Sequence, residues 1–221
     1  MDEKQNLRYE LLKATRYEVS HAKECYEFVA GENAVKRTEA KPDGQLADGI
    51  YLMPYEGDPI LYTGQKVEGG QLFTGVGVKL GDKSLVVALG DMTEDEITLT
   101  KQQGGTRFIT SYHDAVADWN GKENTDDIRG ILNDDILLGE SEHIPSLGEL
   151  YFILLHIRDI NAALEAIGGK PLCGWYWAST QYSATYAWYL NLYYGLAYYY
   201  SAKATRQGRV RAVSAFLPLN C

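Results

Sequence analysis

The sequence predicts an α+β protein, and three observations lead to that class. An apolar stripe with helical spacing runs from residue 147 to residue 167. Short segments rich in aromatic and β-branched residues, separated by turn residues, lie on both sides of that stripe. The composition is that of a globular protein, with 45% hydrophobic and 23% charged residues in a chain of 221. This length suits one large domain, or one domain with an appendage.

Net charge and hydropathy exclude some classes of partner. The formal net charge of −9 disfavours general electrostatic binding to nucleic acid. Apolar runs stay well short of the roughly 20 residues that cross a bilayer, so no membrane insertion is expected. The first residues lack the basic-then-apolar layout of a signal peptide. We expect a chain that is not exported by that route, or one whose leader was removed.

The N-terminal part is predicted to be a separate segment, residues 1–71, which serves assembly or attachment. Residues 3–30 are predicted to be helical because Leu12, Val19 and Tyr26 repeat every seven residues. This helix either packs on its own domain or forms a stalk that joins subunits, with a homotrimer as the expected assembly. A polar linker over 34–47 and a small β segment with strands at 49–53 and 60–63 follow.

Residues 72–221 are predicted to form the main domain. Residues 75–89 read as a hairpin turning at Gly81-Asp82-Lys83, and residues 111–120 as a short helix. The acidic stretch 124–142 is expected to be a solvated loop, because its spacing does not match a calcium-binding EF-hand loop.

The clearest helix prediction covers residues 147–167. Ser146 and Glu149 have the spacing of a capping box, and Gly168-Gly169 is expected to end the helix. The apolar stripe between them is expected to face the core. After Gly174 the chain is predicted to be entirely β, ending in a strand over 209–216.

The sequence offers no recognisable catalytic or metal-binding constellation. The three cysteines lie far apart, and the four histidines form no ligand pair. Glycine-rich phosphate loops and a nucleophile elbow are not found. We therefore predict no enzyme activity, no cofactor and no bound metal.

One stretch of the chain is unusual in composition. Of 17 tyrosines, nine fall between Tyr176 and Tyr200, and no Asp, Glu, Lys or Arg occurs from Trp175 to Tyr200. The tract is either an unusually aromatic β core or an exposed uncharged patch, and such patches usually mark binding surfaces. Tyrosine suits contact surfaces because it offers a large amphipathic area and few torsions to freeze.

Strand alternation favours the exposed patch. With a two-residue turn at Tyr194-Gly195, one face is predicted to be core, and it comprises Trp188, Leu190, Leu192, Ala197 and Tyr199. The other face is predicted to point to solvent, and it comprises Tyr189, Asn191, Tyr193, Leu196, Tyr198 and Tyr200.

Residues 144–169, 175–183 and 209–216 resemble the variable proteins of diversity-generating retroelements found in gut Bacteroides and their phages. The hairpin region 75–91 also fits, so the resemblance covers about residues 72–217. It implies a C-type lectin fold, with mixed antiparallel sheets and two helices, preceded here by an N-terminal helix and a short β segment. In that family a C-terminal tract is rewritten mainly at asparagine codons, and the varied side chains bind diverse ligands.

The resemblance implies a variable ligand-binding face made of Tyr182, Tyr186, Tyr189, Asn191, Tyr193, Tyr194, Leu196, Tyr198, Tyr200 and Thr205. The calcium-ligand motifs EPN and WND of sugar-binding lectins are absent, so calcium-dependent sugar recognition is not implied. The fold is shared with formylglycine-generating enzymes, but no reactive cysteine pair is recognisable.

The expected function is non-enzymatic binding of a bacterial surface protein or glycan, by a receptor binder at a phage tail tip on the virion. Two alternatives stay open at this point: an adhesin of the same fold on the bacterial cell surface, and a glycan-processing enzyme of related fold. Neighbouring genes would separate a tail protein from an adhesin.

Overall fold

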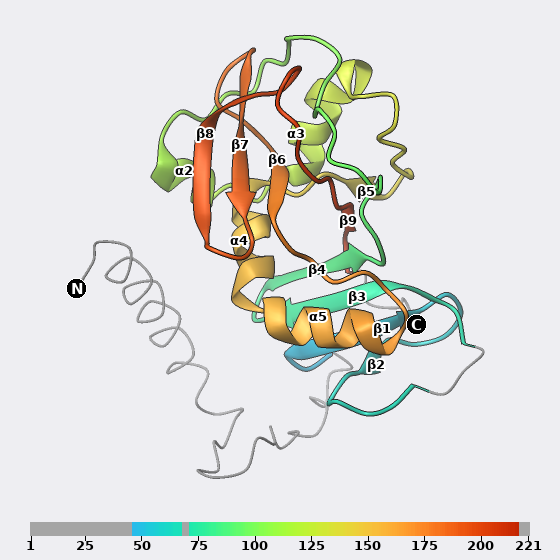
Figure 1. The fold of residues 1–221 in the computed structure, drawn as a ribbon. Helices are drawn as coiled ribbons and strands as arrows, with labels where there is room; N and C mark the ends of the chain where they lie inside the picture. The colour runs from blue at the N-terminus through green and yellow to red at the C-terminus, as the bar shows by residue number, and fades with distance from the viewer. Residues whose placement is uncertain (1–45, 68–70, 217–221) are drawn as a thin grey trace. The chain divides into compact units, whose positions relative to one another are not determined.

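The computed structural model describes residues 46–67 and 71–216. The helix predicted over residues 3–30, and with it the stalk and the trimer, lies outside the described residues. The described residues from Asp48 onward belong to one compact unit. Its architecture is mixed α+β with two antiparallel sheets, which confirms the predicted class (Figure 1).

The larger sheet has six strands in the order β2-β1-β3-β4-β9-β5. The strands are β1 (Gly49–Pro54), β2 (Ile60–Leu61), β3 (Phe73–Leu80), β4 (Lys83–Ala88), β5 (Glu142–His143) and β9 (Val213–Ser214). The predicted hairpin is confirmed as β3 and β4, which turn at Gly81 with a φ of +59°. Because β1 pairs with β3 along its whole length, the strands predicted before residue 72 belong to the same sheet as that hairpin.

The smaller sheet has the order β6-β7-β8 and contains the aromatic tract: β6 (Trp175–Gln181), β7 (Tyr186–Asn191) and β8 (Leu196–Ala202). The strand predicted over 209–216 is reduced to β9, because the residues before it pair with several segments in turn: Arg209 with β6, Val210 with Met92 and Ala212 with Ala88. Arg209 exchanges main-chain hydrogen bonds with Trp175 and Trp177, and only then does the chain reach the larger sheet.

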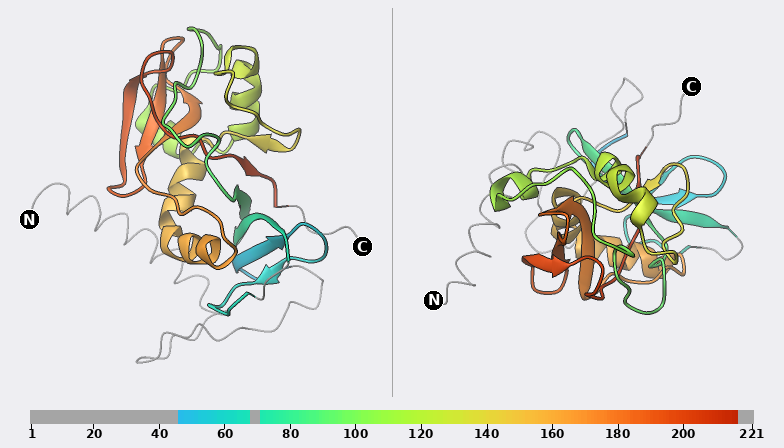
Figure 2. Two further views of the ribbon diagram at one scale, coloured as in Figure 1. Left: turned by 45° about the vertical axis from the view of Figure 1, so that its right-hand side comes forward. Right: turned by 90° about the horizontal axis from the view of Figure 1, so that it is seen from above.

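The predicted helix over 147–167 is two helices, α4 (Leu147–Leu155) and α5 (Ile157–Ala166). The capping box is confirmed: the Ser146 hydroxyl accepts from the Glu149 N–H, and the Glu149 carboxylate accepts from the Ser146 N–H. The helix breaks at His156, whose backbone (φ −111°, ψ 12°) is not helical. The break lets α4 pack under the smaller sheet while α5 lies along β1 and β3, as the views in Figures 1 and 2 agree.

Two other helix predictions need correction. The helix expected over 111–120 is only α2 (Tyr112–Val116). The first half of the acidic stretch is not a loop but α3 (Gly121–Ile128), followed by the short 3-10 helix η1 (Arg129–Ile131). The sequence hides α3 because its buried face includes polar side chains. Thr125, for example, is buried and bonds the carbonyl oxygens of Gly121 and Ile144.

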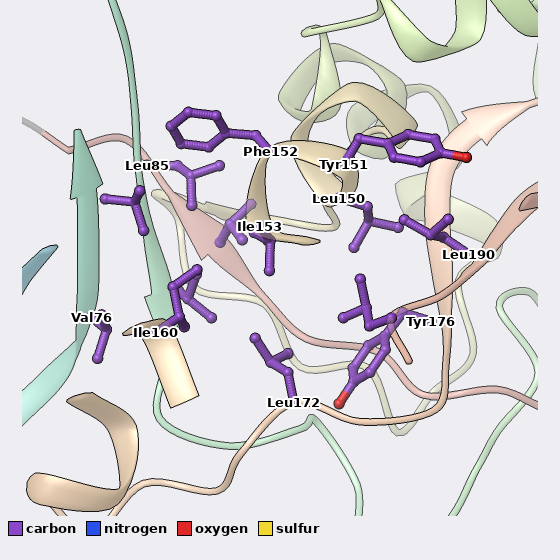
Figure 3. Packing of buried hydrophobic residues seen from close by; sticks show 14 of the residues in the cluster. Val76, Leu85, Leu150, Tyr151, Phe152, Ile153, Ile160, Leu172, Tyr176 and Leu190 are labelled. Carbon is purple, nitrogen blue, oxygen red and sulfur yellow. The ribbon is translucent and has the colours of Figure 1, made fainter. Parts of the chain in front are cut away.

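The core lies on both faces of the smaller sheet. One cluster joins α4, α5 and the two sheets, and it includes Val76, Leu150, Ile160 and Leu190 (Figure 3). The second cluster lies against the opposite face of β6 and β7, and its buried members are Leu99, Ile128, Leu132, Ile136, Ile144, Trp177, Ala187, Tyr189 and Val210. The central strand β7 is therefore covered on both sides. Among the described residues, none of the helices has the length and apolar character needed to span a bilayer.

Candidate ligand-binding face

The core side of the aromatic tract is as predicted for three of its members. Trp188, Leu190 and Leu192 are all buried. Leu190 packs into the cluster around α4, and the Trp188 indole donates a hydrogen bond to the carbonyl oxygen of Ile109 (2.9 Å). The buried Trp188 indole N–H therefore has the hydrogen-bond partner that a buried donor requires.

Tyr189 does not point to solvent, and the prediction that it does is wrong. Its side chain is 1% exposed, and its ring stacks almost parallel on Trp175, with centroids 4.8 Å apart. Its hydroxyl donates to the carbonyl oxygen of Gln207 (2.8 Å). Gly208 lies so close to this ring that a Cβ there would overlap it. The segment around residues 206–210 therefore forms a second cover that strand alternation cannot reveal.

Asn191 is also buried rather than exposed, because it caps the loop that follows it. Its side-chain oxygen accepts hydrogen bonds from the N–H groups of Tyr193 and Tyr194, both at 2.9 Å. Asn191 pairs with Leu196, so the loop has four residues, 192–195, and the predicted two-residue turn is wrong. The positive φ belongs to Gly195, whose N–H donates to the carbonyl oxygen of Asn191.

Strand β8 carries a β-bulge that changes the predicted arrangement of its tyrosines. Tyr198 lies opposite Tyr189 and Ser201 opposite Ala187, so two residues of β8 face the single Trp188 of β7. These two residues are Tyr199 and Tyr200. The Tyr199 ring packs on Trp188 at 5.4 Å, yet the side chain is 37% exposed, so Tyr199 is not the core residue that alternation predicted.

Four tyrosines gather on this side of the sheet, and we call Tyr182, Tyr186, Tyr199 and Tyr200 the tyrosine cluster. The ring of Tyr200 lies 4.2 Å from Tyr199 and 5.6 Å from both Tyr182 and Tyr186. Tyr182 and Tyr186 are half-buried, whereas Tyr200 is 64% exposed. A hydrogen bond with the neighbouring Tyr200 hydroxyl raises the pKa of Tyr199 above its ordinary value.

The remaining predicted face residues lie elsewhere around β8. Tyr193 and Tyr194 form the hairpin tip, strongly exposed, with their rings edge to face at 4.8 Å. Tyr198 is 55% exposed on the opposite side of the sheet from the tyrosine cluster, where it packs beside Trp175. Leu196 is half-buried and Thr205 is exposed just after β8. The predicted residues thus surround one strand instead of sharing one flat face.

Sequence reasoning missed one exposed aromatic neighbour of the tract. Tyr112, at the start of α2, is 46% exposed, and its ring lies 6.0 Å from that of Trp188. Its hydroxyl shares a 2.9 Å hydrogen bond with that of the buried Tyr151. No local signal ties residue 112 to residue 188, because only the tertiary packing brings them together.

A buried polar network supports the end of β8. Lys203 is fully buried, and its ammonium group donates to the carbonyl oxygen of Gly104 and to the side-chain oxygen of Gln181. The Gln181 amide in turn donates to Asp127 at 2.8 Å. Burial lowers the pKa of Lys203 to about 8. The network ties the loop at residues 104–107 to the sheet.

Asp127 is held as a carboxylate at the other end of this network. Burial by itself raises the pKa of this carboxyl, but hydrogen bonds from Thr106, from the Arg107 N–H and from Gln181 outweigh it. The net effect lowers the pKa to about 2. The charged groups of Lys203 and Asp127 therefore hold the main chain around the aromatic tract in position, and they lie away from the exposed tyrosines.

Several titratable groups elsewhere in the described residues make hydrogen bonds or ion pairs within the fold. The Asp118 carboxylate accepts from Asn120, Asn124 and Thr180, and Glu149 lies 3.2 Å from His143 at the start of α4. Asp134, in the second half of the acidic stretch, pairs with Lys101 at 2.7 Å. Within the described ranges, no three His, Cys, Asp or Glu side chains are placed to hold a metal ion.

The sequence was compared with models of protein families and with curated proteins. No family model matches the chain, and no curated protein matches it significantly.

Proposed function

We propose that this chain is a non-enzymatic ligand-binding protein with a C-type lectin fold, and that β8 and its flanking tyrosines form the binding face. One observation carries the proposal: Tyr193, Tyr194, Tyr198 and Tyr200 are each more than half exposed, although they follow one another along a single uncharged hairpin. Two antiparallel sheets joined by α4 and α5 are compatible with the fold.

The physical case is that these side chains contribute contact area without contributing much to the core. Exposed tyrosines present a large amphipathic surface at low cost in side-chain entropy. They are backed by buried neighbours such as Trp188 and Tyr189, which keep the strand in place. Such a division suits a diversified surface, since exposed positions tolerate substitution while the scaffold stays unchanged.

The proposed face is a revision of the one that the sequence predicted. Tyr189 and Asn191 leave it, because both are buried and hold the hairpin together. Tyr112 and Tyr199 join it. The proposed setting is a phage tail tip on the virion, with a bacterial surface protein or glycan as ligand. This setting depends on the resemblance of residues 144–169, 175–183 and 209–216. An adhesin on a bacterial surface would use the same face.

The test measures binding of the purified full-length chain to gut bacterial cells. We expect Tyr200→Ala and Tyr198→Ala to weaken binding by about tenfold or more, since central interface tyrosines are frequent hot spots, while their melting temperatures stay near that of the parent. Tyr55→Ala is the matched control, because Tyr55 is also more than half exposed but lies just after β1, a strand of the larger sheet.

If the β8 variants bind as tightly as the parent, the site lies elsewhere on the chain. Loss of binding in Tyr55→Ala as well would indicate non-specific adhesion. Treating the cells with protease or with glycosidases before binding separates a protein ligand from a glycan. Release of free sugar from the cells by the pure chain would favour the enzyme alternative.

A further inference from the structure

The two outer edges of the smaller sheet differ in how their main chain is used. Along β6, groups outside the sheet pair with the strand: the N–H of Trp177 donates to Arg209, that of Ser179 donates to Pro145, and the carbonyl of Gln181 accepts from Ile109. Isolated β-bridges also pair Tyr176 with Arg209 and Gln181 with Phe108. The β6 edge is therefore closed.

The outer edge of β8 is open in the described part of the chain. Between Leu196 and Ser201, no main-chain hydrogen bond to any element other than β7 is found among residues 46–67 and 71–216. In an antiparallel pair, alternate residues direct their N–H and C=O groups away from the partner strand. Those groups of β8 therefore face outward, where a further strand would pair with them.

This edge also lacks most devices that block strand addition. Natural edge strands are commonly protected by lysine, proline or inward-pointing charges. β8 reads LAYYYSA and contains none of these. Its only irregularity is the bulge at Tyr199 and Tyr200, which bends the strand and interrupts its register at one point.

Aromatic side chains stand on both sides of the open edge. Tyr198, beside Trp175, lies on one side of the sheet, and Tyr199 and Tyr200 lie on the other. Side chains of an added strand would point alternately to the two sides and meet these rings in turn. Recognition by strand addition combines main-chain hydrogen bonds with such alternating side-chain contacts.

We infer that the open edge of β8 binds an extended segment of a polypeptide, which adds as a fourth strand to the β6-β7-β8 sheet. The inference rests on the proposed function and narrows it: the ligand is a surface protein recognised partly through its main chain. A glycan would use the tyrosine rings but could not continue the ladder of hydrogen bonds.

The experiment alters the ligand, so that folding of the chain is not at issue. Linear peptides are selected from a random display library on the immobilised full-length chain and resynthesised with single N-methyl groups at successive residues. We expect N-methylation to weaken binding about tenfold or more at every second residue, with at most one slip at the bulge, and to be tolerated between. Hydrogen exchange of the 196–202 amides should slow on binding, while that of β2, the edge strand of the other sheet, should not change.

Three results would overturn the inference. Uniform tolerance of N-methylation would show recognition through side chains alone. Slowed exchange over 196–202 without added peptide, in a concentration-dependent dimer, would show that a second copy of the chain occupies the edge. The third result is that the library yields no binding peptide and that cell binding survives protease but not glycosidase treatment. This result would support the tyrosine face as the binding site and would contradict strand addition. Failure of cell binding itself would count against the proposed function instead.

Discussion

Strands β7 and β8 are neighbours with similar aromatic composition and opposite surroundings. β7 reads YAWYLN and is buried from Ala187 to Asn191, whereas β8 reads LAYYYSA and exposes three consecutive tyrosines. The central strand has a sheet neighbour on each side and a core cluster on each face. Among the described strands, the edge strand β8 has β7 as its one neighbour. Position in the sheet, and not residue type, therefore decides which tyrosines are scaffold and which are available for contact.

The pair Tyr189 and Tyr198 gives the largest expected contrast, because the two residues lie directly opposite each other. Tyr189→Ala should lower the free energy of unfolding by about 3–5 kcal/mol, since it leaves a cavity against Trp175 and Trp177. Tyr198→Ala should cost at most about 1 kcal/mol. Urea denaturation of both variants measures the difference. Equal losses would show that β8 is packed like β7.

A smaller effect is expected at the loop that joins the two strands. Asn191→Ala removes the acceptor for the N–H groups of Tyr193 and Tyr194, and should cost about 1–2 kcal/mol, as loss of a comparable side-chain cap does. Asn191→Asp keeps the acceptor and serves as the matched control. Faster hydrogen exchange at residues 193 and 194 in Asn191→Ala only would confirm the cap. Identical exchange in both variants would mean that Gly195 alone holds the loop.

A pH dependence is expected from the buried strand and not from the edge strand. Burial raises the pKa of Tyr189 to about 12, above the ordinary value of 10.0. A folded-state pKa above the unfolded value means that this contribution to stability is complete below about pH 10 and is lost as the pH rises toward 12. Tyr189→Phe should reduce the fall in stability over that range, as followed by denaturation at a series of pH values. Tyr198→Phe should leave the fall unchanged.

Lys203 should make the free energy of unfolding rise with pH, over a lower pH range than the fall expected from Tyr189. Burial lowers the pKa of Lys203 from 10.5 to about 8, so the unfolded chain binds this proton more tightly than the folded chain does. Its contribution to stability is therefore lost as the pH falls from about 10.5 to about 8. Lys203→Met, which keeps the length of the side chain without the charge, should flatten that rise. An unaltered pH profile in this variant would show that Lys203 is hydrated in the folded protein.

Several local features were predictable from the sequence, because each depends on residues close together in the chain. The capping box at Ser146 and the β3-β4 hairpin follow from local hydrogen bonding and turn geometry. The burial of Trp188, Leu190 and Leu192 follows from strand alternation, which reports correctly that one face of β7 is core. The uncharged, tyrosine-rich character of residues 175–200 is a property of composition alone.

Other features were decided only by tertiary structure, because they depend on which distant segment covers a surface. Alternation separates two faces but does not say that residues 206–210 bury the second one, and so it placed Tyr189 outside. The apolar stripe over 147–167 is continuous, and the break at His156 appears because its two halves pack on different sheets. The bulge that turns Tyr199 and Tyr200 to one side exists only in the register between β7 and β8. Local sequence sets what each segment can form, whereas long-range packing sets which side chains remain free to bind.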